Sequence, residues 1–395
     1  EIRFADVPAA LEDALATGKA SAAYIDSRAP LRDALIEMTC AAGVRLVGPA
    51  MDQTTLLGDR KSLSRLCAES GLVLKDGREV ANIEQAREAA RALSYPVLIR
   101  PGQAQRGDAV AYDEGQLERI FARIEDGAIV ERFLEDIVEC AVIILSDGKT
   151  ARAAAVLEML EEAGISSLDC AEVLPPFSIP KRTWEMLAAK AEKFAAVSRI
   201  QGMTTVRLGL RYDVAYFLSA TAGGSREVPF ADLSLSSNII AATAAIFDGA
   251  PLEKAWPGAP AEARTVFIRQ PLFSFDRFPG ADTVLGADPR STGDVVGSGA
   301  NFAEAFANAR RAAGRPLPPG GTVFVSLRDR DKRDGMLLGA ELKKAGFKVV
   351  ATEGTAKALS GAGVQARVVY RVSEGRPNVV DLIKNQEISM VIYTP

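Results

Sequence analysis

Hydroxyl, glycine and lysine residues follow two apolar runs near the end of the chain, a combination that can hold a phosphate group. Ser326 ends the run VFVS, and Lys332 follows at a predicted helix start. Thr352, Gly354 and Thr355 follow the run KVVA in the same way. Because parallel strands end at one edge of a sheet, where the next helices present free N–H groups, these residues predict an anion-binding pocket. The alternative interpretation is a packing module in which ordinary serine and threonine residues cap helices.

The absence of histidine excludes several kinds of catalytic site. A Ser-His-Asp or Cys-His pair, a histidine-ligated zinc ion and an imidazole general base are all impossible. The four cysteines lack the C-x-x-C spacing of a metal or redox site. They predict reduced, mostly buried thiols in a cytoplasmic protein, and they are Cys40, Cys67, Cys140 and Cys170.

Length and charge limit the classes of partner. With 395 residues, the chain can hold two or three domains. A net charge of −4 leaves no large basic face, so nucleic acid is not an expected partner. No apolar run approaches the ~20 residues that cross a bilayer, and no signal peptide opens the sequence, so a membrane partner is not expected either.

The elements that must position the chemistry follow from apolar periodicity and turn residues. PVLIRP predicts a buried strand that carries Arg100 at its exit. Asp147-Gly148 predicts a hairpin between two antiparallel strands, and TTVRLGLRYDVAYFLSAT predicts two strands that meet near 211–213. The segment 272–299 is predicted to be a loop-rich connection. Helices are predicted over 62–70, 83–93, 181–200 and about 238–249.

After the linker PLPPGG, at 316–321, the pattern changes. Four apolar runs, VFVSL, KVVAT, ARVVYRV and MVIYT, alternate with segments of helical periodicity. This alternation is typical of a parallel sheet with crossover helices. The helices are predicted over 335–345, 356–361 and 379–385.

Three segments of the C-terminal third carry a family resemblance. LFSFDRFPGADTVLGADPRSTGDVVGSGANFAEAF begins at Leu272, and KKAGFKVVATEGTAKAL and EGRPNVVDLIKN come further on. Their order, spacing and residue identities resemble the end of the carbamoyl-phosphate synthetase large subunit, where an ATP-grasp core meets a methylglyoxal-synthase-like regulatory domain. The resemblance extends from about Leu31 onward, but only over the second half of such a subunit.

The resemblance implies a multidomain α/β and α+β fold, with an ATP-grasp core followed by a Rossmann-like parallel-sheet domain. Residues 1–55 are then a partial pre-ATP-grasp domain. Residues 56–315 are an ATP-grasp-like domain with a mobile lobe at about 95–165. Residues 319–395 are a methylglyoxal-synthase-like effector domain, which is shorter than is usual in the family.

Part of a nucleotide site is retained by resemblance. Arg100 matches an arginine that contacts ATP phosphates, and Glu139 matches the carboxylate that holds the ribose. Phe133 and Leu134 lie in the hinge that receives adenine. Arg226, in GGSREVPF, matches an arginine that faces the acyl substrate. In the alternative interpretation, Arg100 only forms a salt bridge at a strand end and Glu139 faces solvent.

The metal-binding positions of the family have changed. Arg207 replaces a glutamine, and Ser219 and Thr221 replace the glutamate and asparagine of an E-x-N-P-R motif. Gly223 replaces the arginine of that motif, and Met159 replaces a lid histidine. The glycine-rich loop, here GQAQRG, is about two residues shorter by alignment with the family. Because an arginine repels a divalent cation, Mg²⁺ is not expected.

Carboxylates near Met159 offer a less favoured substitute metal site. They lie in and after EMLEEAG, which resembles an exposed helix or lid edge more than a ligand cluster. The candidates are Glu158, Glu161, Glu162 and Asp169.

The terminal pocket also has a family counterpart, which binds phosphorylated effectors such as nucleoside monophosphates. Ser326, Lys332 and the VVATEGTA residues match it, and Arg371 takes the place of a family lysine. The late Asn-Thr-Thr of the family is here Tyr393, Thr394 and Pro395.

These departures favour a non-catalytic regulatory or scaffolding subunit that binds ATP or ADP, or a phosphorylated metabolite, without Mg²⁺. Such a subunit is expected to self-associate or to bind a partner enzyme subunit. The alternative is an active ATP-dependent ligase that phosphorylates a carboxylate or carbamate through a rearranged Mg²⁺ site. A third possibility is a sensor that acts only through residues 319–395.

Overall fold

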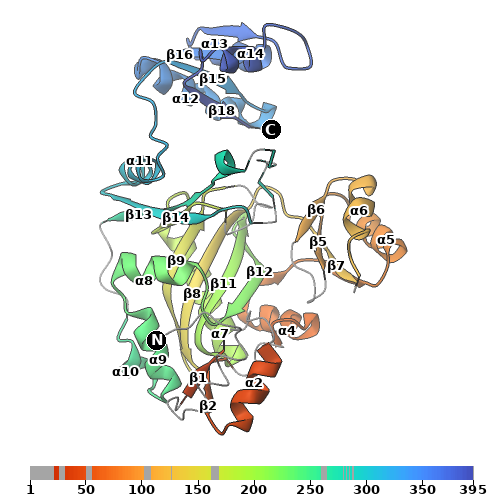
Figure 1. Ribbon diagram of the computed structural model, residues 1–395, viewed down its shortest axis with the longest axis vertical. Coiled ribbons are helices and arrows are strands. Elements are labelled where there is room, and N and C mark those ends of the chain that lie inside the picture. Colours follow the sequence, from red (N-terminus) through yellow and green to blue (C-terminus); the bar gives the residue numbers. More distant parts are fainter. Residues whose placement is uncertain are drawn as a thin grey trace. The chain divides into compact units, whose positions relative to one another are not determined.

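The computed structural model divides the chain into two compact units, Glu1–Ala313 and Gly314–Pro395 (Figure 1). The division lies next to the predicted linker at 316–321. All four cysteines are free and three of them are buried, as predicted. The structure describes residues 22–25, 32–49, 56–101, 108–125, 127–161, 169–258, 265–278, 280–281, 283, 285–286 and 289–394.

An eight-stranded sheet forms the centre of the first unit, in the order β14-β13-β10-β9-β8-β11-β12-β3. Its strands are antiparallel, except where β12 pairs with β3. The predicted hairpin at Asp147-Gly148 is confirmed, because it joins β8 to β9. The strands are β3 (Val73–Leu74), β8 (Val138–Asp147), β9 (Ala151–Met159), β10 (Glu172–Leu174), β11 (Gln201–Arg211), β12 (Val214–Ala222), β13 (Val266–Leu272) and β14 (Gly293–Gly299).

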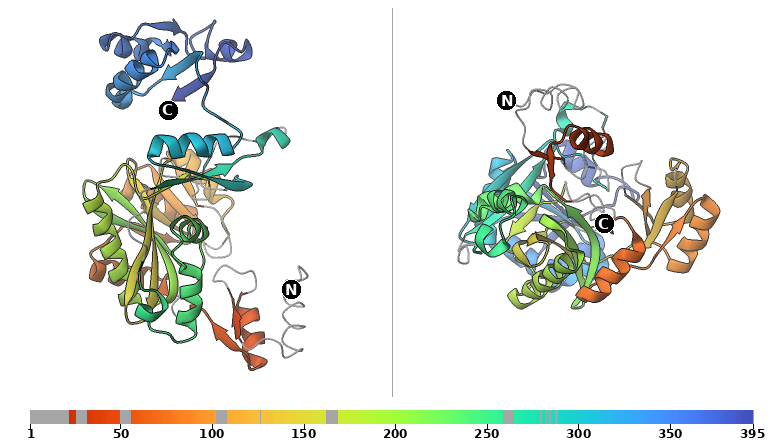
Figure 2. Two further views of the ribbon diagram at one scale, coloured as in Figure 1. Left: turned by 90° about the vertical axis from the view of Figure 1, so that its left-hand side faces the viewer. Right: turned by 90° about the horizontal axis from the view of Figure 1, so that it is seen from below.

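Helices cover both faces of this sheet (Figure 2). The apolar side chains of β8 alternate between the faces, as the two-residue period of a strand requires. Val142 and Ile144 pack with α7 (Lys181–Ser198) and α4 (Arg60–Ser70). Ala141 and Ile143 pack on the other face, with α8 (Glu227–Leu235), α9 (Ile239–Phe247) and α10 (Leu252–Ala255).

A separate four-stranded sheet forms a small lobe, in the order β4-β7-β5-β6. Its core joins Val97, Ile99 and Val130 to apolar residues of two helices. Both helices begin at a residue whose side chain caps the first turn, Asn82 and Asp113. The elements are β4 (Gly77–Val80), α5 (Ile83–Leu93), β5 (Val97–Pro101), β6 (Ala109–Ala111), α6 (Glu114–Phe121) and β7 (Ala128–Arg132).

A short βαβ unit precedes these sheets. Strand β1 (Ala22–Tyr24) pairs in parallel with β2 (Arg45–Val47), and α2 (Arg32–Ala41) connects them. The predicted helices at 62–70, 83–93, 181–200 and about 238–249 correspond to α4, α5, α7 and α9.

Two sequence-based boundaries differ from the structure. The lobe predicted at about 95–165 crosses both sheets, because the small sheet ends at Arg132 and residues 138–159 belong to the large sheet. The prediction of a loop-rich segment over 272–299 is wrong at its end. There β14 pairs with β13 and packs under α11 (Phe302–Ala312). A Cβ atom on Gly297 would lie 2.2 Å from the backbone nitrogen of Ala309, so this glycine allows a close approach rather than a loop.

The second unit is the predicted parallel sheet, in the order β17-β16-β15-β18. One face packs on α12 (Lys332–Lys344) and α13 (Glu353–Gly361), and the other packs on α14 (Val379–Lys384). The two units together have the predicted mixed α/β and α+β fold class. The strands are β15 (Thr322–Ser326), β16 (Lys348–Thr352), β17 (Ala366–Val369) and β18 (Met390–Tyr393).

Within the part of the chain that the structure describes, no single helix is long and apolar enough to cross a membrane. Helices α8 and α9 pass such a test only as a pair bent by 112°. Both contribute buried residues to the core of the first unit.

Candidate functional site

The three positions where the family would place metal ligands lie together on the large sheet. Arg207 on β11 pairs with Ser219 on β12, and Thr221 pairs with Thr205 two residues along. Side chains two residues apart on a strand share a face, so the arginine and the two hydroxyl residues lie on one face of the sheet. Glu139 on β8 lies on this face too, because it pairs with Gly209 on β11.

The side chain of Arg207 forms an ion pair on this face. Its Nη2 lies 2.5 Å from Oε1 of Glu227, the first residue of α8. The two side chains are 16% and 6% exposed, so the pair is largely shielded from water. Burial opposes the ionisation of Glu227, but the Arg207 charge and the hydrogen bonds to Ser225, Arg207 and the backbone together outweigh it and lower the pKa of Glu227 to about 2.

The carboxylates close to Arg207 determine which oxygen ligands a magnesium ion would find here. Mg²⁺ requires oxygen ligands in a near-octahedral shell. Of the three carboxylates nearby, Glu227 is paired with Arg207, and Glu172 is paired with Arg269, with 2.8 Å between Oε1 and Nη2, whereas the side chain of Glu139 has no ion pair with any described residue. The described residues contain no group of three potential metal-ligating side chains.

Arg226 belongs to a second charge network at the start of α8. Its Nε and Nη2 lie 2.8 Å and 2.7 Å from Oδ2 of Asp294. Oδ1 of Asp294 lies 2.9 Å from Nη1 of Arg269, whose other side contacts Glu172. The arginine predicted to face an acyl substrate is therefore held by a carboxylate of β14.

Arg100 reaches from the small lobe to the large sheet. Its Nη2 donates to the carbonyl oxygen of Leu218 at 3.1 Å. Leu218 lies at a β-bulge of β12, where the register shifts after Arg207 and one residue is left out of the pairing. Such a bulge leaves a backbone group free of the ladder.

Three cations converge on one buried carboxylate beside this contact. Nε of Arg100 and Nζ of Lys75 lie 3.2 Å and 3.1 Å from Oε2 of Glu131, and Nη1 of Arg60 lies 2.8 Å from its Oε1. Asp108 is 3.6 Å from Arg100. Burial lowers the pKa of Lys75, and Glu131 acts against that shift. The sequence reasoning missed Arg60, Lys75 and Glu131, because no motif or spacing marks them.

The predicted adenine and ribose positions lie where the two sheets join. Phe133 and Leu134 connect β7 of the small sheet to β8 of the large one. Glu139 follows at the start of β8, and its side chain makes no hydrogen bond or ion pair with any described residue. Burial raises its pKa, although the charges of Arg207, Lys75 and Arg100 act in the opposite direction.

The carboxylates considered as a substitute metal site have structural partners. Oε2 of Glu158 accepts hydrogen bonds from the backbone N–H groups of Phe177 and Ser178 at 2.7 Å and 2.8 Å. Glu161 accepts one from Ala171, and Asp169 accepts from two backbone N–H groups of the segment before β14. Glu162 and the loop GQAQRG lie outside the described residues.

The prediction that EMLEEAG begins as an exposed helix or lid edge is wrong. Glu158 and Met159 end the buried strand β9 and are 3% and 4% exposed. A charged residue such as Glu158 usually indicates an exposed segment. Here the Glu158 carboxylate is buried because backbone N–H groups donate hydrogen bonds to it.

In the second unit, the structure brings together most of the predicted phosphate residues. Oγ of Ser326 lies 3.4 Å from Oγ1 of Thr352, which lies 3.3 Å from Oγ1 of Thr355. Lys332 lies over Gly354, since a Cβ atom there would be 3.0 Å from its Nζ. These residues occupy the carboxyl ends of β15 and β16 and the first turns of α12 and α13.

Arg371 stands apart from this group. It follows β17, is exposed, and has its Nε 3.7 Å from Oε1 of Glu374. Nζ of Lys332 lies 2.5 Å from Oδ1 of Asp329. This hydrogen bond and the Lys332 charge lower the pKa of Asp329, and the Arg371 charge adds to the effect. Pro395 lies outside the described residues.

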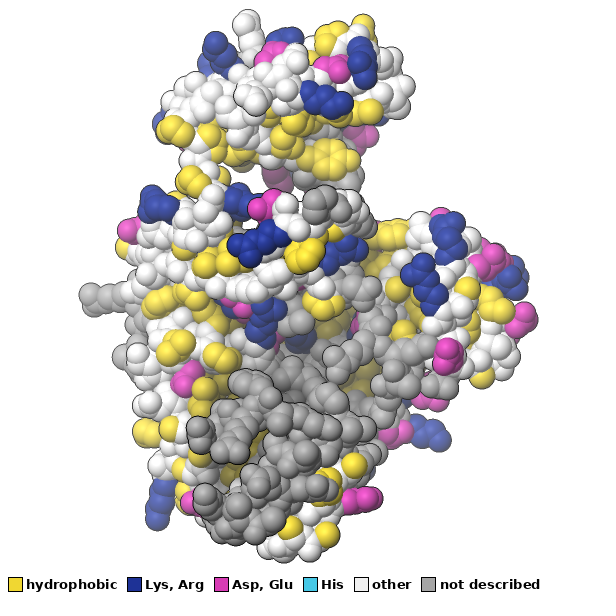
Figure 3. Space-filling model, in the orientation of Figure 1, with side chains coloured by type: hydrophobic (Ala, Val, Ile, Leu, Met, Phe, Trp, Pro, Cys, Tyr) yellow, Lys and Arg dark blue, Asp and Glu magenta, His cyan; other side chains and the backbone are white. Residues whose placement is uncertain are grey.

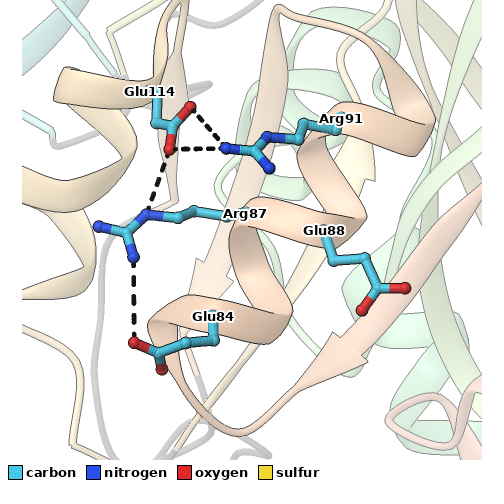
Figure 4. Close-up of a pocket in the computed structure, with 5 residues that line it drawn as sticks. All are labelled: Glu84, Arg87, Glu88, Arg91 and Glu114. Carbon is cyan, nitrogen blue, oxygen red and sulfur yellow. Dashed lines mark hydrogen bonds and ion pairs between the residues drawn. The ribbon is translucent and has the colours of Figure 1, made fainter.

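A surface hollow of about 420 Å³ lies on the small lobe, between α5 and α6 (Figure 4). Arg87 and Arg91 reach Glu114 at 3.3 Å and 3.2 Å, while Glu88 points away from them. These exposed ion pairs link two helices. The hollow lacks the apolar walls and convergent polar groups of a ligand site.

Comparisons with known proteins identify the family. Residues 59–255 match the model of the carbamoyl-phosphate synthase L chain, ATP binding domain, and residues 336–395 match the MGS-like domain. The chain is 33% identical over 376 residues to the carbamoyl phosphate synthase large chain, C-terminal section, of Aquifex aeolicus, which covers 89% of this chain and 70% of that protein. The chain belongs to the carbamoyl phosphate synthase large-chain family.

Two relatives named as carbamoyl phosphate synthase large chains are longer than this chain. The chain is 35% identical over 367 residues to the large chain of Acidobacterium capsulatum, covering 90% of this chain and 34% of that protein. It is 34% identical over 380 residues to the large chain of Thermotoga neapolitana, covering 89% and 35%. The chain thus spans about a third of the length of these relatives.

Solved structures show the same fold at low sequence identity. The biotin carboxylase domain of a single-chain bacterial carboxylase is 17% identical, with a TM-score of 0.57 over 78% of this chain and 74% of that one. The corresponding domain of the Hydrogenobacter thermophilus 2-oxoglutarate carboxylase is 16% identical, with a TM-score of 0.56 over 74% and 72%. These likenesses show the ATP-grasp fold of this synthase-family chain, and only the fold.

Proposed function

We propose that this chain is a non-catalytic member of the family that binds a nucleotide without transferring its phosphoryl group. The ion pair between Arg207 and Glu227 carries the proposal. Phosphoryl transfer relies on a metal ion that bridges phosphate oxygens and neutralises developing charge. An unpaired guanidinium ~4 Å from a divalent ion opposes it by about 8 kcal/mol at an effective dielectric constant of about 20. Glu227 offsets part of this repulsion, but its carboxylate is then engaged by Arg207 instead of serving as a metal ligand.

Several groups support the binding of ATP or ADP where the small sheet joins the large sheet. The match to an ATP-binding domain covers residues 59–255. Arg100 and Lys75 bring positive charge to the junction of the two sheets, where Glu139 keeps an unpaired carboxylate. A nucleotide phosphate would compete with Glu131 and Asp108 for Arg100. Phe133, Leu134 and Glu139 are the proposed adenine and ribose contacts.

The C-terminal unit is the proposed effector site. Ser326, Lys332, Thr352, Gly354 and Thr355 supply hydroxyl, ammonium and backbone N–H groups at one sheet edge. Arg371, which stands apart from them after β17, is the proposed additional charge. A phosphorylated metabolite is the ligand class that these groups favour. Binding there would make the chain a regulatory or scaffolding subunit, either self-associated or bound to a partner enzyme subunit.

Thermal unfolding of the chain with ADP or ATP, in Mg²⁺ or in EDTA, tests the nucleotide proposal. We expect both nucleotides to stabilise the chain equally in Mg²⁺ and EDTA, and ATP to release no ADP. Mg²⁺-dependent ADP release would contradict the proposal and support the active ligase. If neither nucleotide stabilises the chain, the junction of the two sheets does not bind a nucleotide, and the effector site is the one remaining proposed ligand site.

A ligand-restoring variant sharpens the test. Arg207→Gln, Ser219→Glu and Thr221→Asn together return the family residues to the metal positions. In that variant Mg²⁺ should tighten ADP binding about tenfold, or ~1.4 kcal/mol. Arg211→Gln, at the end of the same strand, is the matched control and should leave ADP binding insensitive to Mg²⁺.

A further inference from the structure

Arg207 uses only part of its hydrogen-bonding capacity in the ion pair with Glu227. A guanidinium carries five N–H donors in a planar fork. Within the part of the chain that the structure describes, the side chain of Arg207 has one hydrogen bond or ion pair, from Nη2 to Oε1 of Glu227. The side chain is 16% exposed, so it is not sealed inside the fold. Arg207 can therefore hold Glu227 with one nitrogen and donate to a ligand with the others.

Arg100 approaches the same point of the large sheet from the small lobe. Its Nη2 donates to the carbonyl oxygen of Leu218 at 3.1 Å, and the next residue, Ser219, pairs in register with Arg207. Burial raises the pKa of Glu139, and the charges of Arg207 and Arg100 both oppose that rise. Two guanidinium groups from different sheets thus act on one carboxylate.

Further positive charge lies around this point. Nζ of Lys75 is 3.1 Å from Oε2 of Glu131, the oxygen that Arg100 also contacts. Lys and Arg side chains also show at the surface of the first unit, over β14 and just below it (Figure 3). A chain of phosphate groups carries several negative charges, so it is attracted to these cations.

We propose that Arg207 takes the place of the metal ion and donates directly to the β- and γ-phosphates of the nucleotide. This inference rests on the proposed binding of nucleotide without Mg²⁺. In phosphoryl-transfer enzymes, metal ions bridge the β- and γ-phosphate oxygens. Arg207 stands at one of the positions where the family has a metal ligand, and its planar fork matches two phosphate oxygens. The site then selects nucleoside di- and triphosphates over monophosphates.

Glu227 has two opposing effects in this arrangement. Its carboxylate orients the Arg207 guanidinium, but it also repels the phosphates that the guanidinium attracts. Removing the two partners should therefore change nucleotide affinity in opposite directions, weaker in Arg207→Gln and tighter in Glu227→Gln. A pair with only a structural role predicts changes in the same direction, because either substitution breaks the same buried contact.

Titration calorimetry with AMP, ADP and ATP in EDTA tests the contact. The parent is the full chain with Lys332→Ala, which removes the cation of the proposed effector site and so suppresses phosphate binding there. We expect ADP and ATP to bind the parent more tightly than AMP. Arg207→Gln should weaken ADP and ATP binding about 10- to 150-fold, the range for a hydrogen bond to a charged group, and reduce the preference over AMP. Glu227→Gln should tighten ADP binding about tenfold.

Arg182→Gln is the matched control for the loss of one positive charge. Arg182 is exposed on α7, which packs on the opposite face of the large sheet, and its side chain has no partner among the described residues. ADP affinity should not change in this variant. A loss as large as that in Arg207→Gln would assign the effect to net charge and overturn the direct contact.

A second comparison keeps the test valid if Arg207→Gln does not fold. Glu227→Gln and the double variant Arg207→Gln with Glu227→Gln both lack the carboxylate, so they differ only in the guanidinium. ADP should bind the double variant about 10- to 150-fold more weakly. Equal ADP affinity in these two variants, weaker ADP binding in Glu227→Gln than in the parent, or equal affinity of the parent for AMP and ADP would overturn the proposal and leave the nucleotide site standing. No ADP binding to the parent would remove both.

Discussion

Arg207 and Glu227 balance each other on a buried face, so each is expensive to remove alone. Arg207→Gln would leave the Glu227 carboxylate, 6% exposed, without its cation. Breaking a buried pair in this way costs about 3 kcal/mol or more in unfolding free energy. Arg207→Gln with Glu227→Gln should recover part of this loss, because no charge is then stranded. Urea denaturation measures both.

Arg119→Gln provides the reference for this comparison. Arg119 is exposed on α6 and has no ion pair with any described residue, so its loss should change stability by less than ~0.5 kcal/mol. If Arg207→Gln destabilises the chain no more than Arg119→Gln does, the buried pair does not stabilise the fold and Arg207 can move away from a metal ion at little cost.

The lowered pKa of Asp147 predicts a contribution to stability that is lost in acid. Burial opposes its ionisation, but hydrogen bonds from the backbone N–H groups of Leu252, Thr150 and Lys149 lower its pKa from 3.8 to about 2. A carboxylate whose pKa is lower in the folded state stabilises the fold above its unfolded pKa, and this gain disappears as the pH falls. The difference in unfolding free energy between the wild type and Asp147→Asn should be constant above pH ~5 and shrink from pH ~4 to pH ~2. A difference that stays constant down to pH 2 would contradict this assignment.

At the scale of the elements, two glycines of β14 differ in how much space a side chain would have. Gly297 of β14 lies against α11, where a Cβ atom would come within 2.2 Å of Ala309 N and 2.5 Å of Ala305 O. Gly297→Ala must therefore push the helix away, at a cost of about 1–3 kcal/mol in unfolding free energy. Gly293→Ala, on the same strand with nothing within 4 Å of its Cβ position, should be neutral or slightly stabilising. Equal effects of the two substitutions would show that α11 does not pack as described.

Strand β14 also illustrates which elements could be predicted from the sequence and which could not. Strong local signals succeeded: Asp147-Gly148 marked its hairpin, and the apolar runs after the linker marked a parallel sheet. Strand β14 was missed because GDVVGSG contains glycines that only long-range packing on α11 explains. Helix α8 was missed because it contains Pro229, which the first turn of a helix tolerates.

The candidate site likewise contains residues that the sequence identified and contacts that it did not. The resemblance assigned Arg207, Ser219 and Thr221 to metal positions, and the pattern of strand ends grouped Ser326 with Thr352. The structure brings the members of each group close together. The sequence did not predict Glu227 as the partner of Arg207 or the convergence of Arg60 and Lys75 on Glu131. These contacts join residues far apart in the chain, and their types alone do not identify the partner. Only the packing of α8 and of the small lobe brings them together.

For the whole molecule, the division at Ala313 predicts two unfolding steps. Each unit has its own sheet and its own hydrophobic core, so each can lose its structure cooperatively by itself. Differential scanning calorimetry of the full chain should show two transitions. A ligand that binds only the native form of one unit raises the midpoint of that transition alone, by an amount that grows with the ratio of its concentration to its Kd.

The two proposed sites can therefore be separated in one experiment. ADP at 100 times its Kd should stabilise the first unit by ~2.7 kcal/mol, and a nucleoside monophosphate at the same ratio should stabilise the second unit by as much. Lys332→Ala should abolish the second shift and keep the first. A single transition that both ligands move would instead mean that the units unfold as one. The effector site would then be energetically coupled to the proposed nucleotide site. Such coupling is what allosteric regulation between the two sites requires.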